Sequence, residues 1–384
     1  MDINIKDMFD KDAKRLGYLY GFAKSKSAKK RIAFDLCKFQ VLYEKMISCD
    51  YHFKWDSDDE IFNQIYINNR KDFLFFVNNY VNNYDFYSKS SSNVLDIYKS
   101  VDYNFDYRDG FHKSFSYDEA CLILKDFFAS LGDKYYCFFN DLLSSNFLYM
   151  DYPDKSDAGF TFDIGSIFKS YAVCSSSVFS LYSMSVIVHE VGHCYERMLQ
   201  YNSCSCVNDF GSILYEVSSC FFELLFIRYL EDKRICPKDS YIVNDLYLND
   251  FYNNMFELNL ICDFKDVLWD AKANLDVDKD LISKRVEYFN NLYCGNNRYY
   301  DYCSSNKINV RDSMSYGYGA LLSFHMYEKY LEDREYFLKG FDDIMMTYFL
   351  INDFSVFERV NISSNDFYDN KPIRKVLSKY MDMK

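Results

Sequence analysis

The sequence predicts a mainly α-helical protein. Only three prolines and twelve glycines interrupt its 384 residues, so few positions carry a residue that ends a helix. Apolar side chains recur at helical spacing in most segments, for example at Phe39, Leu42, Tyr43 and Met46. Because 49% of the residues are apolar, the chain can bury a large core. No linker separates domains, so we expect helices packed against one another throughout.

Along the chain, residues 1–115 are expected to form an N-terminal helical region and residues 116–384 the main body. In the first region, the serine cluster Ser88–Ser92, interrupted only by Lys89, is the best candidate for a loop. The main body opens with a helix expected over Ala120–Leu131, which Ser116–Glu119 begins and Gly132 ends. The segment 157–165 is bracketed by glycines and alternates Phe160 and Phe162, which is typical of a strand.

A metal-binding motif follows at His189-Glu190-Val191-Gly192-His193. Imidazoles at positions i and i+4 lie on one face of a helix, where both can reach one metal ion, and Glu190 stands beside them to activate water. The chain has only five histidines, so chance produces this motif in roughly a few chains per thousand. Two buried, hydrogen-bonded histidines are the alternative. The motif predicts a hydrolytic zinc site.

A catalytic zinc ion usually takes three protein ligands and leaves one position for water. The next helix is expected over residues 211–225, and it is apolar on most of its circumference. Four polar residues share one stripe of this helix at i, i+3, i+4 and i+7: Glu216, Ser219, Cys220 and Glu223. A loop over residues 202–209 leaves room for an antiparallel return, so Glu216 is the candidate third ligand.

The motif followed by Glu216-x-x-Ser219-x-x-x-Glu223 resembles the oligoendopeptidase F and thimet oligopeptidase group of zinc metallopeptidases. The likeness extends to Ser116–Glu119, to Asp157–Phe160 and to Tyr316–Gly319, so it covers about residues 116–330. It implies a helical zincin-type fold, in which a small β-sheet borders a deep active-site cleft. Residues 116–384 would then be the catalytic domain, and the N-terminal region would be shortened relative to the family.

The resemblance also implies roles for the motif residues. His189, His193 and Glu216 would ligate one Zn²⁺ per chain, and Glu190 would be the general base. The chemistry agrees, because zinc lowers the pKa of its water to about 7 and a neighbouring carboxylate can take the proton. Such a site also accepts other divalent metals.

One layer behind the ligands, Glu223 is expected to hold a ligand imidazole through its other ring nitrogen, with Ser219 nearby. An ordinary ion pair of Glu223 with Arg228 or Arg197 is the alternative. Cys220 is expected to be a buried structural thiol.

A tyrosine near the C-terminus stabilises the oxyanion in this family. Tyr316 best fits the family's Tyr-x-x-Gly pattern and Tyr318 is the second candidate, with Gly317 and Gly319 allowing a non-helical approach of either ring. Asp312 and Met314 depart from the family, which commonly has aromatic residues there.

Gly159 and Phe160 are candidates for substrate binding, since the corresponding segment borders the cleft in the resembled peptidases. An exposed strand edge offers main-chain hydrogen bonds to an extended peptide. A plain hairpin strand is an equal alternative.

We therefore expect a zinc-dependent endopeptidase that hydrolyses oligopeptides. The alternatives are a metallocarboxypeptidase with the same His-Glu-x-x-His site and a non-catalytic, zinc-stabilised peptide-binding protein.

The net charge of −13 argues against nucleic acid and membrane lipids as partners and would steer basic peptides toward the protein. No signal peptide or stretch long enough to span a bilayer is expected. The thirteen cysteines follow no regular framework, which favours free thiols in a cytoplasmic protein. Of the other histidines, His52 and His112 are expected at the surface and His325 in the core.

Overall fold

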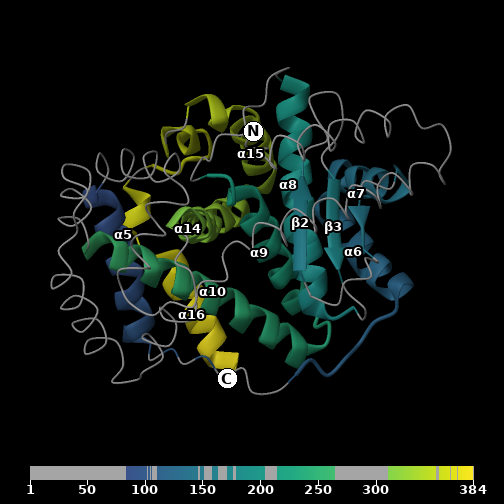
Figure 1. Cartoon of the computed structure of the whole chain (residues 1–384), viewed down its shortest axis with the longest axis horizontal. Helices are drawn as coiled ribbons and strands as arrows, with labels where there is room; N and C mark the ends of the chain where they lie inside the picture. Colours follow the sequence, from purple (N-terminus) through teal and green to yellow (C-terminus); the bar gives the residue numbers. More distant parts are fainter. Residues whose placement is uncertain are drawn as a thin grey trace, which may run out of the picture.

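A computed structural model gives the fold of the chain (Figure 1). The structure describes residues 84–101, 103, 105, 110–145, 148–150, 158–162, 171–175, 179–203, 214–263, 310–351, 354–363, 365–369 and 371–383. This part is mainly helical, as expected. Its α-helices are α5 (Tyr84–Ser100), α6 (Tyr117–Leu131), α7 (Asp133–Ser145), α8 (Leu181–Ser203), α9 (Val217–Asp232), α10 (Pro237–Asp263), α14 (Val310–Glu332), α15 (Arg334–Ile351) and α16 (Lys371–Met383). The 3-10 helices η1 (Phe354–Val360) and η2 (Asp366–Tyr368) lie between α15 and α16.

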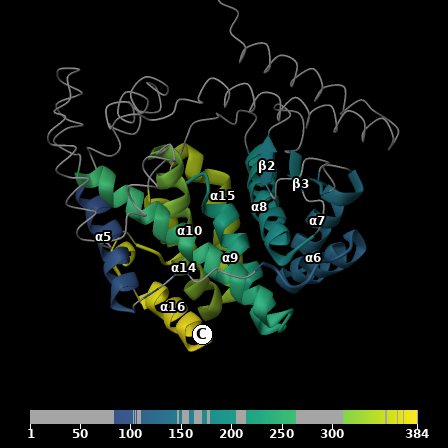
Figure 2. The ribbon, with the colours of Figure 1, turned by 60° about the horizontal axis from the view of Figure 1, so that its bottom comes forward.

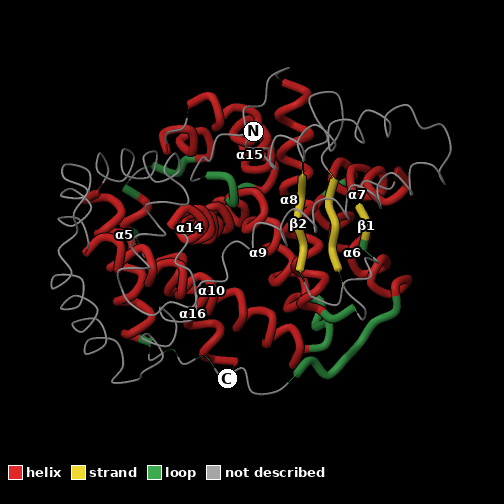
Figure 3. The backbone as a smooth tube through the Cα atoms, viewed as in Figure 1, coloured by secondary structure: helices red, strands yellow, loops and turns green. Residues whose placement is uncertain are grey.

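Three short strands form a sheet that packs on α8 (Figure 3). The strands β1 (Leu148–Tyr149), β2 (Ala158–Phe162) and β3 (Tyr171–Ser175) have the order β1-β3-β2. β3 pairs in parallel with β1 and antiparallel with β2. β2 lies within the segment expected to be a strand, and the rest of that segment is outside the described residues. Within the described part, one edge of β2 has no strand partner.

The helix α8 separates two groups of elements. The sheet and the pair α6–α7 lie on one side of it, whereas α9, α14, α10, α5 and α16 lie on the other (Figures 1 and 2). α9 contacts α8, α14 and α10, so it is covered from several directions. This position explains why its residues from Val217 to Leu230 are buried at nearly every position and not along one stripe.

Local signals set both ends of α6. Ser116 accepts a hydrogen bond from the Glu119 amide, while the Glu119 carboxylate accepts one from the Ser116 amide. This capping box satisfies two amide groups that lack partners in the first turn. Gly132 ends the helix with a φ of 125°, a conformation that favours glycine. Both ends are confirmed.

The loop expected over Ser88–Ser92 is wrong, because α5 runs through these residues. Ser90 and Ser91 are fully buried, and their hydroxyl groups donate to the carbonyl oxygens of Phe86 and Tyr87, 2.8 Å away in each case. A serine hydroxyl group that donates to a carbonyl oxygen of the preceding helical turn has its hydrogen bond satisfied without water, so such a serine can lie in a buried helix.

α5 belongs to the expected N-terminal region and packs against α10 and α16. Residues 1–83, which include Phe39–Met46 and His52, lie outside the described residues. His112 is exposed and His325 is buried beside Phe367, as expected.

Among the residues that the structure describes, no helix has the length and apolar character needed to cross a membrane. Five of the cysteines are free thiols: Cys121, Cys137, Cys194, Cys220 and Cys236.

Candidate metal centre

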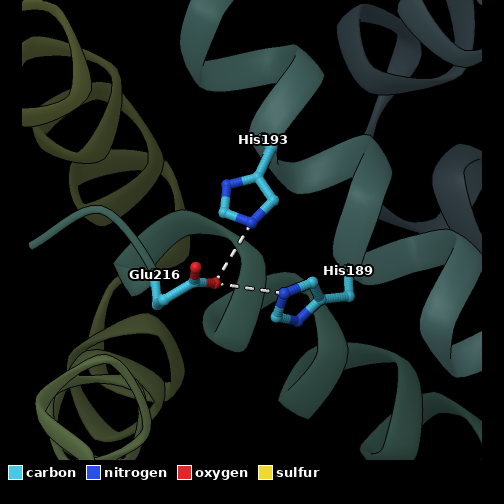
Figure 4. Close-up of side chains that lie close together, drawn as sticks. All are labelled: His189, His193 and Glu216. Carbon is cyan, nitrogen blue, oxygen red and sulfur yellow. Dashed lines mark ion pairs between the residues drawn. The ribbon is translucent and has the colours of Figure 1, made fainter. Parts of the chain in front are cut away.

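The helix α8 carries both motif histidines. It begins at Leu181 and continues to Ser203, two residues into the loop expected over residues 202–209. His189 and His193 lie one turn apart and are 8% and 5% exposed. Their side chains point from the same face of α8 toward the start of α9 (Figure 4).

Glu216 is the residue that caps the start of α9, with φ −92° and ψ 4°. The expectation of a helix from residue 211 is therefore wrong over Leu214–Glu216, which form a turn closed by the Val217 amide and the Leu214 carbonyl oxygen at 3.1 Å. Glu216 thus precedes the helical stripe and does not belong to it. The N-terminus of a helix stabilises a negative charge, so this position suits a carboxylate.

The three side chains converge on one point. Nε2 of His189 and Nε2 of His193 each lie 3.1 Å from Oε2 of Glu216 (Figure 4). One ligand atom from each residue lies within 4.8 Å of the others. Ligand atoms about 2.0–2.1 Å from a tetrahedral zinc ion are about 3.3 Å apart. The two nitrogens and one oxygen therefore fit a divalent zinc ion.

Two of the three candidate ligands, His189 and Glu216, have hydrogen-bond partners behind them. Nδ1 of His189 lies 3.1 Å from Oε2 of Glu223, and the Ser185 hydroxyl donates to Oε1 of Glu223 at 2.9 Å. Ser219 donates to Oε2 of Glu216 at 2.9 Å. A carboxylate that accepts from Nδ1 fixes the ring so that Nε2 is free to bind a metal.

The arginines considered as alternative partners of Glu223 lie elsewhere. Arg228 forms an ion pair with Glu231 at 2.7 Å. Arg197 lies over the ring of Tyr215, 5.1 Å from its centroid, and the His193 ring also stacks on Tyr215, with 4.7 Å between the ring centroids. The His193 ring is thus held by stacking.

Charge complementarity shapes the ionisation of the ligands. Burial by itself would raise the pKa of Glu216, but the facing imidazoles of His193 and His189 hold it below its ordinary value. Burial opposes protonation of His189, yet the carboxylates of Glu216 and Glu223 raise the pKa of its imidazole well above the usual value. A cation bound beside His189 would neutralise the negative charge of these two carboxylates.

Glu190 points from α8 toward β2 and is 6% exposed. Thr161 of β2 donates to Oε2 of Glu190 at 2.6 Å. Burial raises the pKa of Glu190, while His189, His193 and the Thr161 hydrogen bond act in the opposite direction. A Cβ atom at Gly159 would lie 2.7 Å from Cγ of Glu190, so glycine is what lets β2 lie this close to the carboxylate.

The two candidate tyrosines have different surroundings. α14 is continuous through both, so the expected non-helical approach is wrong. Tyr316 is 38% exposed and its ring stacks on His189 with 5.9 Å between centroids. Tyr318 is fully buried, and its hydroxyl group lies 2.6 Å from Oγ of Ser90. The structure brings Tyr316 beside His189 and leaves Tyr318 in the core.

Glycines allow the close approach of three helices around the centre. A Cβ atom at Gly192 of α8 would lie 2.7 Å from the Cα atom of Ser219 in α9. A Cβ atom at Gly319 of α14 would lie 2.7 Å from the carbonyl oxygen of Glu216. Both contacts are with backbone, which cannot move aside as a side chain can.

A pocket of about 340 Å³ adjoins the centre. Its lining includes His189, Glu190 and Tyr316, together with Gly159 of β2 and one face of α10. Phe160 follows Gly159 in β2 and pairs through its backbone with Val173. Cys220 also lines the pocket, and burial raises the pKa of its thiol well above the usual value, which keeps it neutral.

Sequence reasoning missed Thr161, Ser185 and Asp250. Two of them carried a signal: Thr161 follows Gly159 by two residues, so it shares a strand face with it, and Ser185 precedes His189 by one helical turn. Asp250 lies in α10, 27 residues beyond Glu223, and no local pattern links it to the motif.

Solved structures share the fold of this chain. A "putative peptidase from Chlamydophila abortus" has a TM-score of 0.60 and 15% identity, covering 93% of this chain and 62% of that one. A "putative oligoendopeptidase F from Bacillus anthracis str. Ames" has a TM-score of 0.54 and 12% identity, with 96% and 69% covered. Another structure, described as "putative Oligoendopeptidase F", has a TM-score of 0.55 and 12% identity, with 96% and 70% covered. The chain spans less than two thirds of the first of these structures.

No family model matches the sequence, and no curated protein matches it. The likeness is therefore one of fold.

Proposed function

We propose that this chain, which has the fold of structures described as oligoendopeptidase F, is a zinc-dependent endopeptidase that hydrolyses oligopeptides. The observation that carries the proposal is the convergence of His189, His193 and Glu216 beside the Glu190 carboxylate, at the wall of a pocket. A bound zinc ion would supply a Lewis acid that polarises a peptide carbonyl and acidifies water.

The chain's own residues then divide the remaining work. Glu190 would take a proton from the water molecule as its oxygen attacks the peptide carbon, and would return that proton to the nitrogen as the C–N bond breaks. The hydrogen bond from Thr161 holds Oε2 of Glu190 and leaves Oε1 for the proton. Because burial raises the pKa of Glu190, its protonated form is more accessible than that of an ordinary glutamate, which suits a group that must both accept and donate.

Tyr316 is the proposed donor to the negative charge that develops on the carbonyl oxygen. Its ring stacks on a metal ligand and is exposed to the pocket. A phenol placed there can stabilise the oxyanion more strongly than the neutral carbonyl.

The edge of β2 is proposed to position the peptide. Gly159 lines the pocket and lies against Glu190, so a peptide extended along this strand would pass the general base. Main-chain hydrogen bonds at Gly159 and Phe160 would suit many sequences, since they do not depend on side chains.

Substitution of Glu190 tests the proposal. The protein, loaded with zinc and assayed on a library of end-blocked, quenched fluorescent peptides, is expected to cleave internal bonds. Glu190→Gln should retain about one zinc ion per chain, measured by mass spectrometry of the metal, yet lose at least ~10³ in kcat. Glu335→Gln, at an exposed position of α15, is the matched control and should keep full activity.

Stoichiometric zinc without cleavage by the unsubstituted protein would overturn the endopeptidase proposal in favour of a peptide-binding protein. Cleavage only of peptides with a free C-terminus would favour a carboxypeptidase. Undiminished activity in Glu190→Gln would assign the general base to another group.

A further inference from the structure

One face of α10 forms part of the wall of the pocket. Its lining residues are spaced 4, 3, 1 and 3 positions apart, so they follow a single helical stripe. They are Val243, Tyr247, Asp250, Phe251 and Asn254. Val243, Tyr247 and Phe251 are buried, whereas Asp250 is exposed to the space of the pocket. The stripe is therefore apolar at Val243, Tyr247 and Phe251 and carries one carboxylate, at Asp250.

The carboxylate of Asp250 adds to the negative charge of this pocket. In the described part of the chain, the titratable groups that line the pocket besides Cys220 and the tyrosines are His189, Glu190, Glu223 and Asp250. Three of these four are carboxylates, and Glu223 already accepts from both His189 and Ser185. Asp250 forms no side-chain hydrogen bond or ion pair with any described residue, so within the described part of the chain its carboxylate has no counterion and lines the pocket.

The ionisation of Asp250 is consistent with this position. The surrounding protein, which removes water from the carboxyl group, and the nearby charge of Glu223 raise its pKa to about 7. A carboxylate whose pKa is raised by loss of water and by a like charge is stabilised by any cation that enters beside it.

Asn254, on the same stripe as Asp250, lies beside the proposed oxyanion donor. A Cβ atom at Gly317 would lie 3.5 Å from Cβ of Asn254, and Gly317 follows Tyr316 directly. Asp250 is one turn before Asn254 on the same stripe. A peptide held at Gly159 for attack therefore faces the Asp250 carboxylate within the same pocket.

We propose that Asp250 is a specificity residue that selects peptides with a positively charged group near the cleaved bond. The group is an alkylammonium or a guanidinium, supplied either by a lysine or arginine side chain or by the free amino terminus of a short peptide. The inference rests on the proposed peptidase function and deepens it, because it names the substrate class that this pocket prefers.

Pairs of peptides that differ in one charge test the proposal. Each quenched fluorescent peptide carries lysine at one position on either side of the cleaved bond, and its partner carries norleucine there. One set has an acetylated amino terminus and the other a free one. The unsubstituted protein is expected to cleave at least one charged peptide about tenfold faster in kcat/KM than its neutral partner, as a charge-assisted contact in a partly wet pocket allows.

Two substitutions of Asp250 make the test specific. Asp250→Asn should remove the preference by lowering kcat/KM for the charged peptide while leaving that for the norleucine peptide within about twofold. Asp250→Lys should reverse it and favour glutamate over norleucine at the same position. Asp118→Asn, at an exposed site of α6, removes the same charge from the protein surface and should keep the preference. Zinc content and far-ultraviolet circular dichroism check that each variant is folded.

The outcomes separate the two proposals. A protein that cleaves neither peptide of any pair contradicts the peptidase function itself. A protein that shows neither faster cleavage of lysine than of norleucine peptides nor faster cleavage of free than of acetylated peptides, or whose preference survives in Asp250→Asn, overturns the role of Asp250 while the peptidase function stands. Faster cleavage of lysine than of norleucine peptides within the acetylated set identifies a side chain as the cation, and faster cleavage of the free than of the acetylated norleucine peptide identifies the amino terminus.

Discussion

At the scale of single residues, the tyrosines at 316 and 318 show how a helix separates neighbours. Successive residues of a helix are rotated by about 100°, so two residues that are two positions apart lie on opposite faces of α14. Tyr316 faces the pocket and Tyr318 faces Ser90 of α5. The sequence supplied both candidates, but their faces followed only once α14 was known to be helical through both glycines.

This difference gives a prediction with an internal control. Tyr316→Phe is expected to lower kcat about 10²-fold with little change in KM, because the lost hydrogen bond strengthens only as charge develops. Tyr318→Phe removes a buried hydrogen bond and should lower the free energy of unfolding by about 1 kcal/mol while leaving kcat unchanged. Steady-state kinetics and urea denaturation measure both. A fall in kcat in Tyr318→Phe alone would exchange the two roles.

At the scale of elements, the contact between α8 and α9 sets the distance between the histidines and Glu216. Gly192→Ala would place a methyl group 2.7 Å from the Cα atom of Ser219, so the helices must move apart. We expect a lower affinity for zinc by about tenfold and a loss of stability of about 1–3 kcal/mol, as for other overpacked contacts. Titration with a competing chelator and thermal denaturation measure these effects.

Gly110→Ala is the control for this substitution. A Cβ atom at Gly110 would have no heavy atom within 4 Å, so zinc affinity and stability should stay within error of the unsubstituted protein. Unchanged zinc affinity in Gly192→Ala would mean that α8 and α9 adjust without disturbing the ligands.

Elements with local signals were predictable, and those set by distant contacts were not. The ends of α6 follow from Ser116, Glu119 and Gly132, which act within one turn of the helix. The start of α9 was predicted too early, because Leu214 continues the apolar pattern of the helix. The chain instead forms a turn at Leu214–Glu216, where Gly319 of α14 contacts Glu216. Ser88–Ser92 was assigned to a loop because the hydrogen bonds that satisfy buried serines within a helix leave no mark in the sequence.

At the scale of the whole molecule, a metal ion would connect elements that the chain separates. The ligands come from α8 and from the start of α9, and Glu223 of α9 holds His189 from behind. A ligand that binds only the folded protein stabilises it by about 2.7 kcal/mol at 100 times its Kd.

Removal of zinc is therefore expected to lower the Tm by about 5 °C, since each kcal/mol shifts the Tm of a large domain by roughly 2–4 °C. Differential scanning fluorimetry with and without chelator measures the shift, which re-addition of zinc should reverse. Glu216→Ala should show no such dependence on zinc. An equal shift in that variant would place the stabilising ion elsewhere.

The sequence predicted that His189, His193 and Glu216 would come together, because the motif is local and chemically specific. It did not predict Thr161 or Asp250, which reach the same pocket from β2 and α10 and are joined to the motif only by tertiary packing. His189 and His193 could be identified as candidates from the sequence alone, whereas the position of Asp250 in the wall of the same pocket could be identified only from the fold.

The contact of Gly319 with Glu216 has a consequence for how the protein responds to its ligands. α14 presents Tyr316 to the pocket and, three residues later, supports the backbone of Glu216. A peptide that displaces Tyr316 and an ion that draws in Glu216 act on the same helix from two sides. We therefore expect the affinities for the peptide and the ion to be coupled, in which case each changes the other by the same factor.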